Sequence, residues 1–444
     1  DTVEYFHEAL EPILKSTYGI LVFQEQAILI AQQIAGFDLQ EADILRKAIG
    51  KKKASVMAEV KKSFIEKSEN KGIVTREEAE EIFSWIEKSQ RYSFNKSHSV
   101  SYAYNAYLTA YAKAHFPHEF FTSYLKHAVG KPDTFIEVQE LVNNAKIMGI
   151  NTMPPSIIHM NEEFELIDEH PRYGLTNVKG VGSSVFKKMV SYMHAEGIDP
   201  KACDWSCFLI LVSPKVNKKA FESLILAGAF DCFKIPRSKM QHNFNVIKEF
   251  SKREISWLID YKKQNYELST EQCIQAMIDA SQGKDKNRPI FRRDRCPIVE
   301  DLLRSYNDPG YELFDSASWL AKQEQELLGI ALTCNKVDEY NTDRANCTCK
   351  EFIDGFESQY GAVIAVQIES VREWKIKKGK AKGKSMGFIT AGDTSCILDN
   401  ITAFSDEWEK YKNLLYEGNT VLLRGSRDKN RGSFLVKRVE QLTS

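Results

Sequence analysis

A cluster of basic residues after Asp43 is the first segment whose chemistry suits phosphate. Five cations fall close together: Arg46, Lys47, Lys51, Lys52 and Lys53. Arginine binds phosphate oxygens through a bidentate fork and lysine acts as a mobile point charge, so the cluster predicts contact with phosphate groups. The alternative is a solvated helix end, because Gly50 would stop a helix there and cations complement the helix dipole.

A second candidate segment is Phe94-Asn95-Lys96-Ser97-His98-Ser99, which stands just before a predicted helix from about Val100 to His115. The start of a helix attracts anions, so Lys96 and His98 would suit a phosphate ligand. The alternative is ordinary capping by one of the serines, with His98 at the surface. Along the same helix a tyrosine stripe favours core packing over base stacking; it comprises Tyr104, Tyr107 and Tyr111.

Residues 175–186 carry the signature of a helix–hairpin–helix turn, an apolar residue between two glycines. Glycines let backbone N–H groups approach a DNA phosphate without contact to the bases, and the next helix adds its positive end. The residues predicted to bind DNA in this way are Lys179, Gly180, Val181, Gly182 and Ser183. A glycine-bearing turn without a ligand is the alternative. Residues 216–230 could form a second, weaker hairpin.

From Gly361 the apolar residues follow a period of two, in five strand-like runs with one helix after the third run. This order predicts an OB barrel, a common oligonucleotide-binding scaffold. Its candidate DNA-binding cations crowd one loop and the last strands: Lys375, Lys377, Lys378, Lys380, Lys382, Arg424 and Arg427. Cations and stacking aromatic rings together are typical of single-strand binding. Trp374 would stack on bases, whereas Phe388 and Phe434 are expected to fill the barrel.

Helical patterns dominate the segments that must position these residues. Thr75 and Glu78 form a capping box, and the helix behind it has an apolar face from Ala79 to Ile86. Residues 236–280 are predicted helical, and an apolar-poor, charged linker follows from Gly283 to Pro297. The predicted fold class is therefore multidomain and mostly α, followed by a C-terminal β-barrel of OB type.

The composition restricts the function further. The 444 residues are 43 % hydrophobic with a net charge of −1, which excludes a uniformly basic protein, so any nucleic-acid surface must come from local clusters. No apolar run approaches the roughly 18 residues of a membrane span, and no membrane partner is expected. Nine cysteines without a CxxC pair indicate reduced cytosolic thiols. We assign no metal site.

Five segments occur in an order that resembles the bacterial DNA polymerase III alpha subunits, family C of the DnaE type. They are Tyr18–Gln26, Leu45–Lys53, Phe94–Ser99, Lys113–Pro117 and Lys179–Gly182. The resemblance implies the C-terminal half of such a subunit. Its parts would be helical fingers at 1–158, tandem helix–hairpin–helix elements at 159–235, a helical segment and charged linker at 236–345, and an OB domain at 346–444.

The resemblance also implies roles for single residues. Arg46, Lys47, Lys96 and His98 would contact the incoming deoxynucleoside triphosphate, while Lys51 and Lys52 would contact DNA. The family commonly has arginine at the second position, so Lys47 loses a bidentate contact. Primer-template DNA is an expected partner, and Gly310–Phe314 resembles the end of a sliding-clamp peptide.

Catalysis by such a polymerase needs metal ions held by paired carboxylates. The resemblance implies that these aspartates lie in an upstream palm domain, and here no two aspartates are even separated by one residue. We therefore expect Mg²⁺ to bind a palm-bearing fragment and the present chain to be inactive alone. The expected location is the cytoplasm of a bacterial cell or of a phage-infected host. The alternatives are a non-catalytic DNA-binding scaffold and an error-prone relative in lesion bypass.

Overall fold

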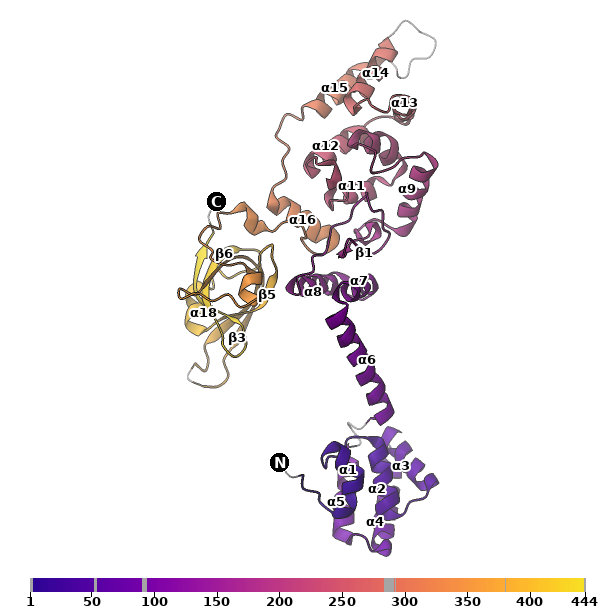
Figure 1. Cartoon of the computed structure of the whole chain (residues 1–444), viewed down its shortest axis with the longest axis vertical. Helices are drawn as coiled ribbons and strands as arrows, with labels where there is room; N and C mark the ends of the chain where they lie inside the picture. Colours follow the sequence, from indigo (N-terminus) through magenta and orange to yellow (C-terminus); the bar gives the residue numbers. More distant parts are fainter. Residues whose placement is uncertain are drawn as a thin grey trace. The chain divides into compact units, whose positions relative to one another are not determined.

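The computed structural model describes residues 3–51, 54–89, 94–282, 291, 293–379 and 381–442. Side chains are described for these residues except 49–51, 54, 55 and 293. The chain divides into two compact units, Asp1–His115 and Phe116–Ser444 (Figure 1). Helices come first and a closed five-stranded barrel comes last, which confirms the predicted fold class. The four-part division of the chain stays a prediction.

The first unit is a helical bundle that begins with the short turns η1 (Glu8–Leu10) and η2 (Lys15–Thr17). Its α-helices are α1 (Glu11–Leu14), α2 (Gln24–Ala35), α3 (Leu39–Lys51), α4 (Ala54–Lys71), α5 (Arg76–Ser89) and α6 (Lys96–His115). The predicted capping box starts α5, because the Thr75 N–H donates to the Glu78 carboxylate at 2.8 Å and the Glu78 N–H donates to Thr75 Oγ1 at 3.2 Å. The predicted apolar face of α5 is buried in the core of the unit.

Helix α6 differs from its neighbours, because none of its side chains is buried. Tyr104, Tyr107 and Tyr111 are all exposed, and so is Tyr102. The expectation that the tyrosine stripe packs in a core is therefore wrong for the described chain. The pattern correctly predicted the helix, but a one-sided stripe says nothing about whether another element covers it.

The second unit starts with helices around one hydrophobic core that runs from Phe121 to Ile330. Its α-helices before the barrel are α7 (Pro117–Ala128), α8 (Thr134–Ile147), α9 (Ser183–Ala195), α10 (Trp205–Cys207), α11 (Lys218–Leu226), α12 (Arg237–Lys248), α13 (Lys252–Gln264), α14 (Thr270–Gln282), α15 (Cys296–Asn307), α16 (Ala317–Leu328) and α17 (Cys349–Ile353). The shorter turns are η3 (Leu175–Asn177), the π-turn η4 (Phe208–Val212), η5 (Ser213–Lys215), η6 (Asp231–Phe233), η7 (Arg293–Arg295) and η8 (Lys336–Glu339). A small hairpin of β1 (Glu165–Ile167) and β2 (His170–Arg172) precedes the first glycine turn. Residues 283–290 and 292 of the predicted linker lie outside the described residues, whereas Cys296 and Pro297 already belong to α15.

A buried ion network stabilises this core. Arg237 donates to both carboxylate oxygens of Asp231, at 2.9 and 2.6 Å, and to Glu324 at 2.9 Å. Glu324 is fully buried and also accepts the N–H groups of Leu332 and Thr333. A buried charge is tolerated when it is paired and hydrogen-bonded. The network therefore joins η6, α12 and α16 into one body.

The barrel consists of strands β3 (Ala362–Lys375), β4 (Ser385–Gly392), β5 (Ile397–Ala403), β6 (Thr420–Arg427) and β7 (Phe434–Gln441). They close in the order β3-β4-β5-β7-β6, with β3 antiparallel to β6 and β5 parallel to β7. Helix α18 (Ser405–Tyr411) lies between β5 and β6 in sequence, as predicted. Gly387 of β4 packs against the Trp408 ring of α18, where a Cβ would collide.

The barrel corrects one residue-level expectation. Phe434 is fully buried, as predicted, but Phe388 is 42 % exposed. Its neighbours Gly387 and Ile389 are both buried. Because successive residues of a strand face opposite sides, Phe388 faces outward.

Two general findings concern the chemistry of the chain. All nine cysteines are free thiols. Across the described residues, no helix combines the length and the apolar character needed to cross a membrane.

Candidate nucleic-acid interface

Arg46 and Lys47 share one carboxylate on the exposed surface of α3. Arg46 donates from Nε and Nη2 to Oδ1 of Asp43 at 3.0 and 2.7 Å, and Lys47 Nζ lies 2.7 Å from Oδ2. These hydrogen bonds, first from Lys47 and then from Arg46, hold the pKa of Asp43 below its usual value. Asp43 therefore orients both cations and cancels one of their charges. Lys51 ends α3, and Lys52 lies outside the described residues.

The segment Phe94–Ser99 is attached to the start of α2. The Gln24 N–H donates to the Phe94 carbonyl at 3.2 Å, and the Lys96 N–H donates to the Glu25 carboxylate at 3.0 Å. The structure thus brings together Tyr18–Gln26 and Phe94–Ser99, two of the segments that the sequence singles out. Glu25 already places a negative charge at the start of α6, where the sequence predicts a phosphate.

Lys96 and His98 lie near aromatic rings of the same unit. Lys96 Nζ is 6.0 Å from the centroid of the Phe23 ring, and the rings of His98 and Tyr102 have centroids 4.5 Å apart. Both predicted side chains are exposed. They are therefore accessible to a ligand.

The first glycine turn joins η3 to α9 and leaves backbone donors open. Gly180 has a φ of +91°, a left-handed conformation that favours glycine. Gly182 is the N-cap of α9 and has no side chain to cap the first turn. Within the described chain, the N–H groups of Gly180, Gly182 and Ser184 have no acceptor. Such a run of open donors at a helix start suits a phosphate.

Two predicted residues of this turn use their N–H groups inside the protein. The N–H of Val181 donates to the Val178 carbonyl at 3.0 Å, and its side chain is buried. The N–H of Lys179 donates to the Leu327 carbonyl of α16 at 3.0 Å. Val181 therefore anchors the turn, while the Lys179 side chain is exposed, with its Nζ 6.0 Å from the centroid of the Phe135 ring.

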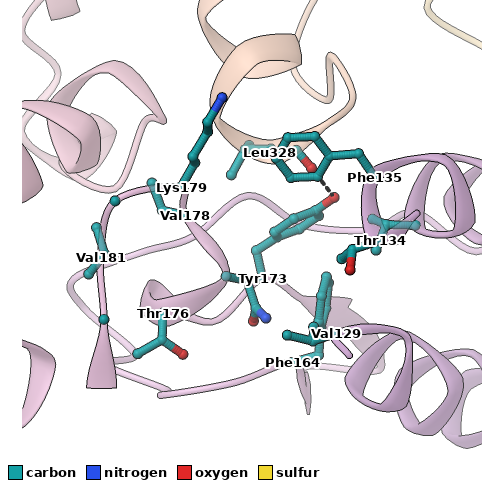
Figure 2. Close-up of a pocket in the computed structure, with 14 residues that line it drawn as sticks. Val129, Thr134, Phe135, Phe164, Tyr173, Thr176, Val178, Lys179, Val181 and Leu328 are labelled. Carbon is teal, nitrogen blue, oxygen red and sulfur yellow. Dashed lines mark hydrogen bonds between the residues drawn. The ribbon is translucent and has the colours of Figure 1, made fainter. Parts of the chain in front are cut away.

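A pocket of about 510 Å³ is lined partly by this turn. Figure 2 shows its lining residues, with Lys179 and Val181 on the turn and Tyr173 and Phe135 beside them. Its lining is mostly apolar and includes Phe135 of α8 and Leu328 of α16. Inside it, Tyr173 Oη donates to the Leu328 carbonyl at 3.2 Å, and burial raises the pKa of Tyr173 far above its ordinary value. One side of the pocket is formed by the turn itself, through Lys179, Gly180 and Gly182, and the apolar residues of the lining support the turn from the other side.

Glu162 and Asn217 contact the starts of the helices α9 and α11. Glu162 accepts a hydrogen bond from Ser183 Oγ and lies 3.8 Å from Lys187 Nζ, so it adds negative charge at the start of α9. In the second hairpin, the Asn217 side chain accepts the N–H groups of Lys219 and Ala220 at 3.0 and 3.2 Å. The start of α11 is therefore capped by its own chain, whereas the start of α9 is open.

On the barrel, Trp374 and Phe388 lie on one outer face. Trp374 is 42 % exposed, with Arg372 5.5 Å and Lys377 5.8 Å from its ring centroid. Phe388 pairs across the strands with Arg372, two residues from Trp374 on the same face. Exposed aromatic rings among cations are typical of surfaces on which the bases of a single strand stack.

The other barrel cations fall into two groups. The exposed ones are Lys375, Lys377, Lys378, Lys382 and Arg424, and Lys380 lies outside the described residues. Arg427 is exposed as well, but it donates to the carbonyls of Phe352 and Ile353 at 2.5 and 3.2 Å, so its guanidinium closes the end of α17.

Comparisons with known proteins agree with this arrangement. Residues 1–72 match the bacterial DNA polymerase III alpha subunit finger domain, and residues 149–240 match a helix-hairpin-helix motif family. The DNA polymerase III subunit alpha of Aquifex aeolicus is 32 % identical over 99 % of this chain and 33 % of its own length. That of Borreliella burgdorferi is 30 % identical over 98 % of this chain and 35 % of its own length. The chain is related to the DNA polymerase III alpha subunits. It spans about a third of the length of these alpha-subunit relatives.

Clusters of metal-ligand side chains were sought in the described part of the chain. No group of three or more His, Cys, Asp or Glu side chains there could hold a metal ion. The residues present do not fit a catalytic Mg²⁺ pair, and we derive no step through one.

Sequence reasoning missed the acidic residues that contact the predicted site residues. Asp43 was detectable, because an acid three and four residues before cations on a helix forms ion pairs. Glu25 and Glu162 were not, since their contacts join segments far apart in the sequence.

Proposed function

We propose that this chain is the nucleotide- and DNA-binding part of a family C replicative DNA polymerase that acts in the bacterial cytoplasm. The carboxylates that bind Mg²⁺ and catalyse nucleotidyl transfer would come from a palm-bearing part. The observation that carries the proposal is the open glycine turn of Gly180–Ser184, in a chain related to alpha subunits along almost its whole length.

The proposed substrates divide between the two units. The triphosphate of an incoming nucleotide would bind Arg46, Lys47, Lys96 and His98, which are all exposed in the first unit. The duplex would bind the open hairpin through its phosphates, without base preference. Single-stranded template would bind the outer face of the barrel, where Trp374 and Phe388 are available for stacking. We give Arg427 a structural role in this proposal.

The main test is primer extension with Mg²⁺ and all four nucleotides. The pure chain should not extend a primer, and a mixture with a palm-bearing fragment should. In the mixture, Arg46→Ala should impair nucleotide use by losing a charge-assisted contact, about 1.5–3 kcal/mol. Arg76→Ala is the matched control, because Arg76 is also exposed and ion-paired but lies on α5. Robust synthesis by the pure chain would contradict the proposal.

A non-catalytic DNA-binding scaffold is the second candidate, because Asp43 already occupies Arg46 and Lys47. This scaffold would bind duplex normally, yet Arg46→Ala would leave the kinetics of every reconstituted polymerase unchanged. Nucleotide KM and kcat in the mixture therefore separate the two functions.

A sliding clamp is a further proposed partner. Tyr311 and Phe314 of the segment Gly310–Phe314 are 64 % and 66 % exposed, as a docking peptide requires. Pull-down with a bacterial sliding clamp tests this partner. Replacing both aromatic residues by alanine should abolish capture, and unchanged capture would exclude this segment.

A further inference from the structure

A pocket beside the second hairpin has no role in the proposed function. It is about 430 Å³ in volume and lies among η5, the start of α11, α12 and α13. Its floor is apolar and contains Phe244, Ile247 and Ile259, all nearly fully buried, with Ile255 half-buried beside them. We call it the lysine-rimmed pocket, after Lys215, Lys218, Lys248 and Lys252 in its lining.

The charge of this pocket is not balanced by the protein. No Asp or Glu belongs to its lining. Throughout the described chain, no carboxylate forms an ion pair with any of the four lysines. Two of them lie over rings instead, with Lys248 Nζ 4.8 Å from the centroid of Phe244 and Lys215 Nζ 5.6 Å from that of Tyr192. By contrast, Lys126 and Lys187 in another pocket form ion pairs with Glu163 and Glu162.

Four lysines without a carboxylate partner surround an apolar floor, and this combination favours a ligand with two properties. It must be anionic, because an interface is favoured by complementary charge. It must also carry a bulky apolar group, because a floor of phenylalanine and isoleucine gains free energy only by covering apolar surface.

A DNA backbone meets the first condition but not the second. Its phosphates and sugars carry no bulky apolar group for the floor, and at the start of α11 beside the pocket Asn217 already accepts the N–H groups of Lys219 and Ala220. An acidic peptide meets both conditions, since its carboxylates reach the lysines while an aromatic or aliphatic side chain fills the pocket.

We propose that the lysine-rimmed pocket binds an acidic segment of a partner protein that inserts a bulky apolar side chain between α12 and α13. This binding site does not depend on the proposed polymerase function. It would give the chain a protein contact that is separate from the open hairpin.

Fluorescence anisotropy of the full chain tests the proposal. The probe is a labelled peptide in which aspartates flank a phenylalanine, and a second peptide replaces the phenylalanine with alanine. The first peptide should bind and the second should bind roughly ten-fold more weakly. Absence of binding, or equal binding of both peptides, would overturn the proposal.

Charge-reversal variants locate the site. The double variant Lys248→Glu with Lys252→Glu should reduce peptide affinity roughly ten-fold or more. Lys239→Glu is the matched control, because Lys239 is exposed on α12 but does not line the pocket, and it should leave affinity unchanged. If the double variant fails to fold by circular dichroism, Lys215→Gln with Lys218→Gln replaces it, with the same expectation. Equal loss in the pocket variant and the control would overturn the assignment.

A competition arm separates the peptide from nucleic acid. Unlabelled single-stranded DNA at matched charge should not displace the peptide from the pocket. Displacement by DNA, together with the same loss of DNA affinity in Lys248→Glu/Lys252→Glu, would make the pocket a nucleic-acid site and reject a protein partner.

Discussion

Asp43 decides how much charge α3 can offer a triphosphate. Its carboxylate is shared by Arg46 and Lys47, so an incoming phosphate must compete with it for both cations. Asp43→Asn removes the competing charge and should lower nucleotide KM in the reconstituted polymerase by a few-fold, with little change in kcat. Steady-state kinetics with Asp38→Asn as control checks this, and a raised KM would show that Asp43 positions the cations.

Glu254 makes the stability of the second unit depend on pH. Burial alone would raise the pKa of Glu254, but hydrogen bonds from Arg295 and from the Ser251 N–H outweigh it, so the pKa lies below 4.5. A depressed folded pKa stabilises the protein above pH 4.5, and this contribution is lost as the pH falls through the folded value. Glu254→Gln should therefore cost about 1.5–3 kcal/mol at pH 7 and progressively less below pH 4.5. Urea unfolding midpoints across this range are the measurement, and a difference that does not depend on pH would contradict the assignment.

At the scale of elements, the start of α9 is open and the start of α11 is capped, because the N-cap residue is Gly182 in α9 and Asn217 in α11. Gly182 has an ordinary φ and free space around its Cβ position, so Gly182→Asp should cap α9 and stabilise it by about 0.5–2 kcal/mol. The same carboxylate should repel DNA phosphates and weaken duplex binding for every sequence. Glu162→Gln should act in the opposite direction and strengthen binding.

Duplex titration at several salt concentrations tests both hairpin variants. Gly130→Asp is the control, since it adds the same charge at another exposed, unstrained glycine. Unchanged duplex affinity in Gly182→Asp would remove the hairpin from the DNA path.

Elements with a clear period could be predicted from the sequence, and their surroundings could not. Each of the five predicted strand runs became a strand, because alternation over several residues has one interpretation. Phe388 was misplaced since a phenylalanine in a strand is compatible with either face. For α6, the pattern gave the helix but not its exposure. The site was predictable as a set of cations, whereas Glu25 and Glu162 depended on tertiary contacts.

At the scale of the whole molecule, the second unit depends on Arg237. Arg237→Ala would leave the fully buried Glu324 without its cation and should cost about 3–5 kcal/mol. Arg304→Ala, which removes an exposed ion pair, should cost about 0–1 kcal/mol. Urea unfolding followed by tryptophan fluorescence reports mainly this unit. Of the six tryptophans, only Trp85 lies in the first unit, Asp1–His115. Equal midpoints for both variants would contradict a structural role for the network.

The predicted domain boundary between residues 235 and 236 separates Asp231 from Arg237. This boundary stays a prediction, and the ion network and the hydrophobic core both have members on each side of it. Contacts between residues of different segments leave no local signal in the sequence, so the sequence could not predict this ion network.

The exposed helix α6 has a consequence for solution experiments. A helix that buries no side chain is held mainly by its own hydrogen bonds and by its ends, and a segment with few buried apolar contacts opens locally at low free-energy cost. Amide deuterium exchange should therefore be faster in α6 than in α2, whose inner face is buried. The four exposed tyrosines of α6 should also be nitrated readily. If a protein or nucleic acid covers this helix, its addition should slow amide exchange and lower nitration together.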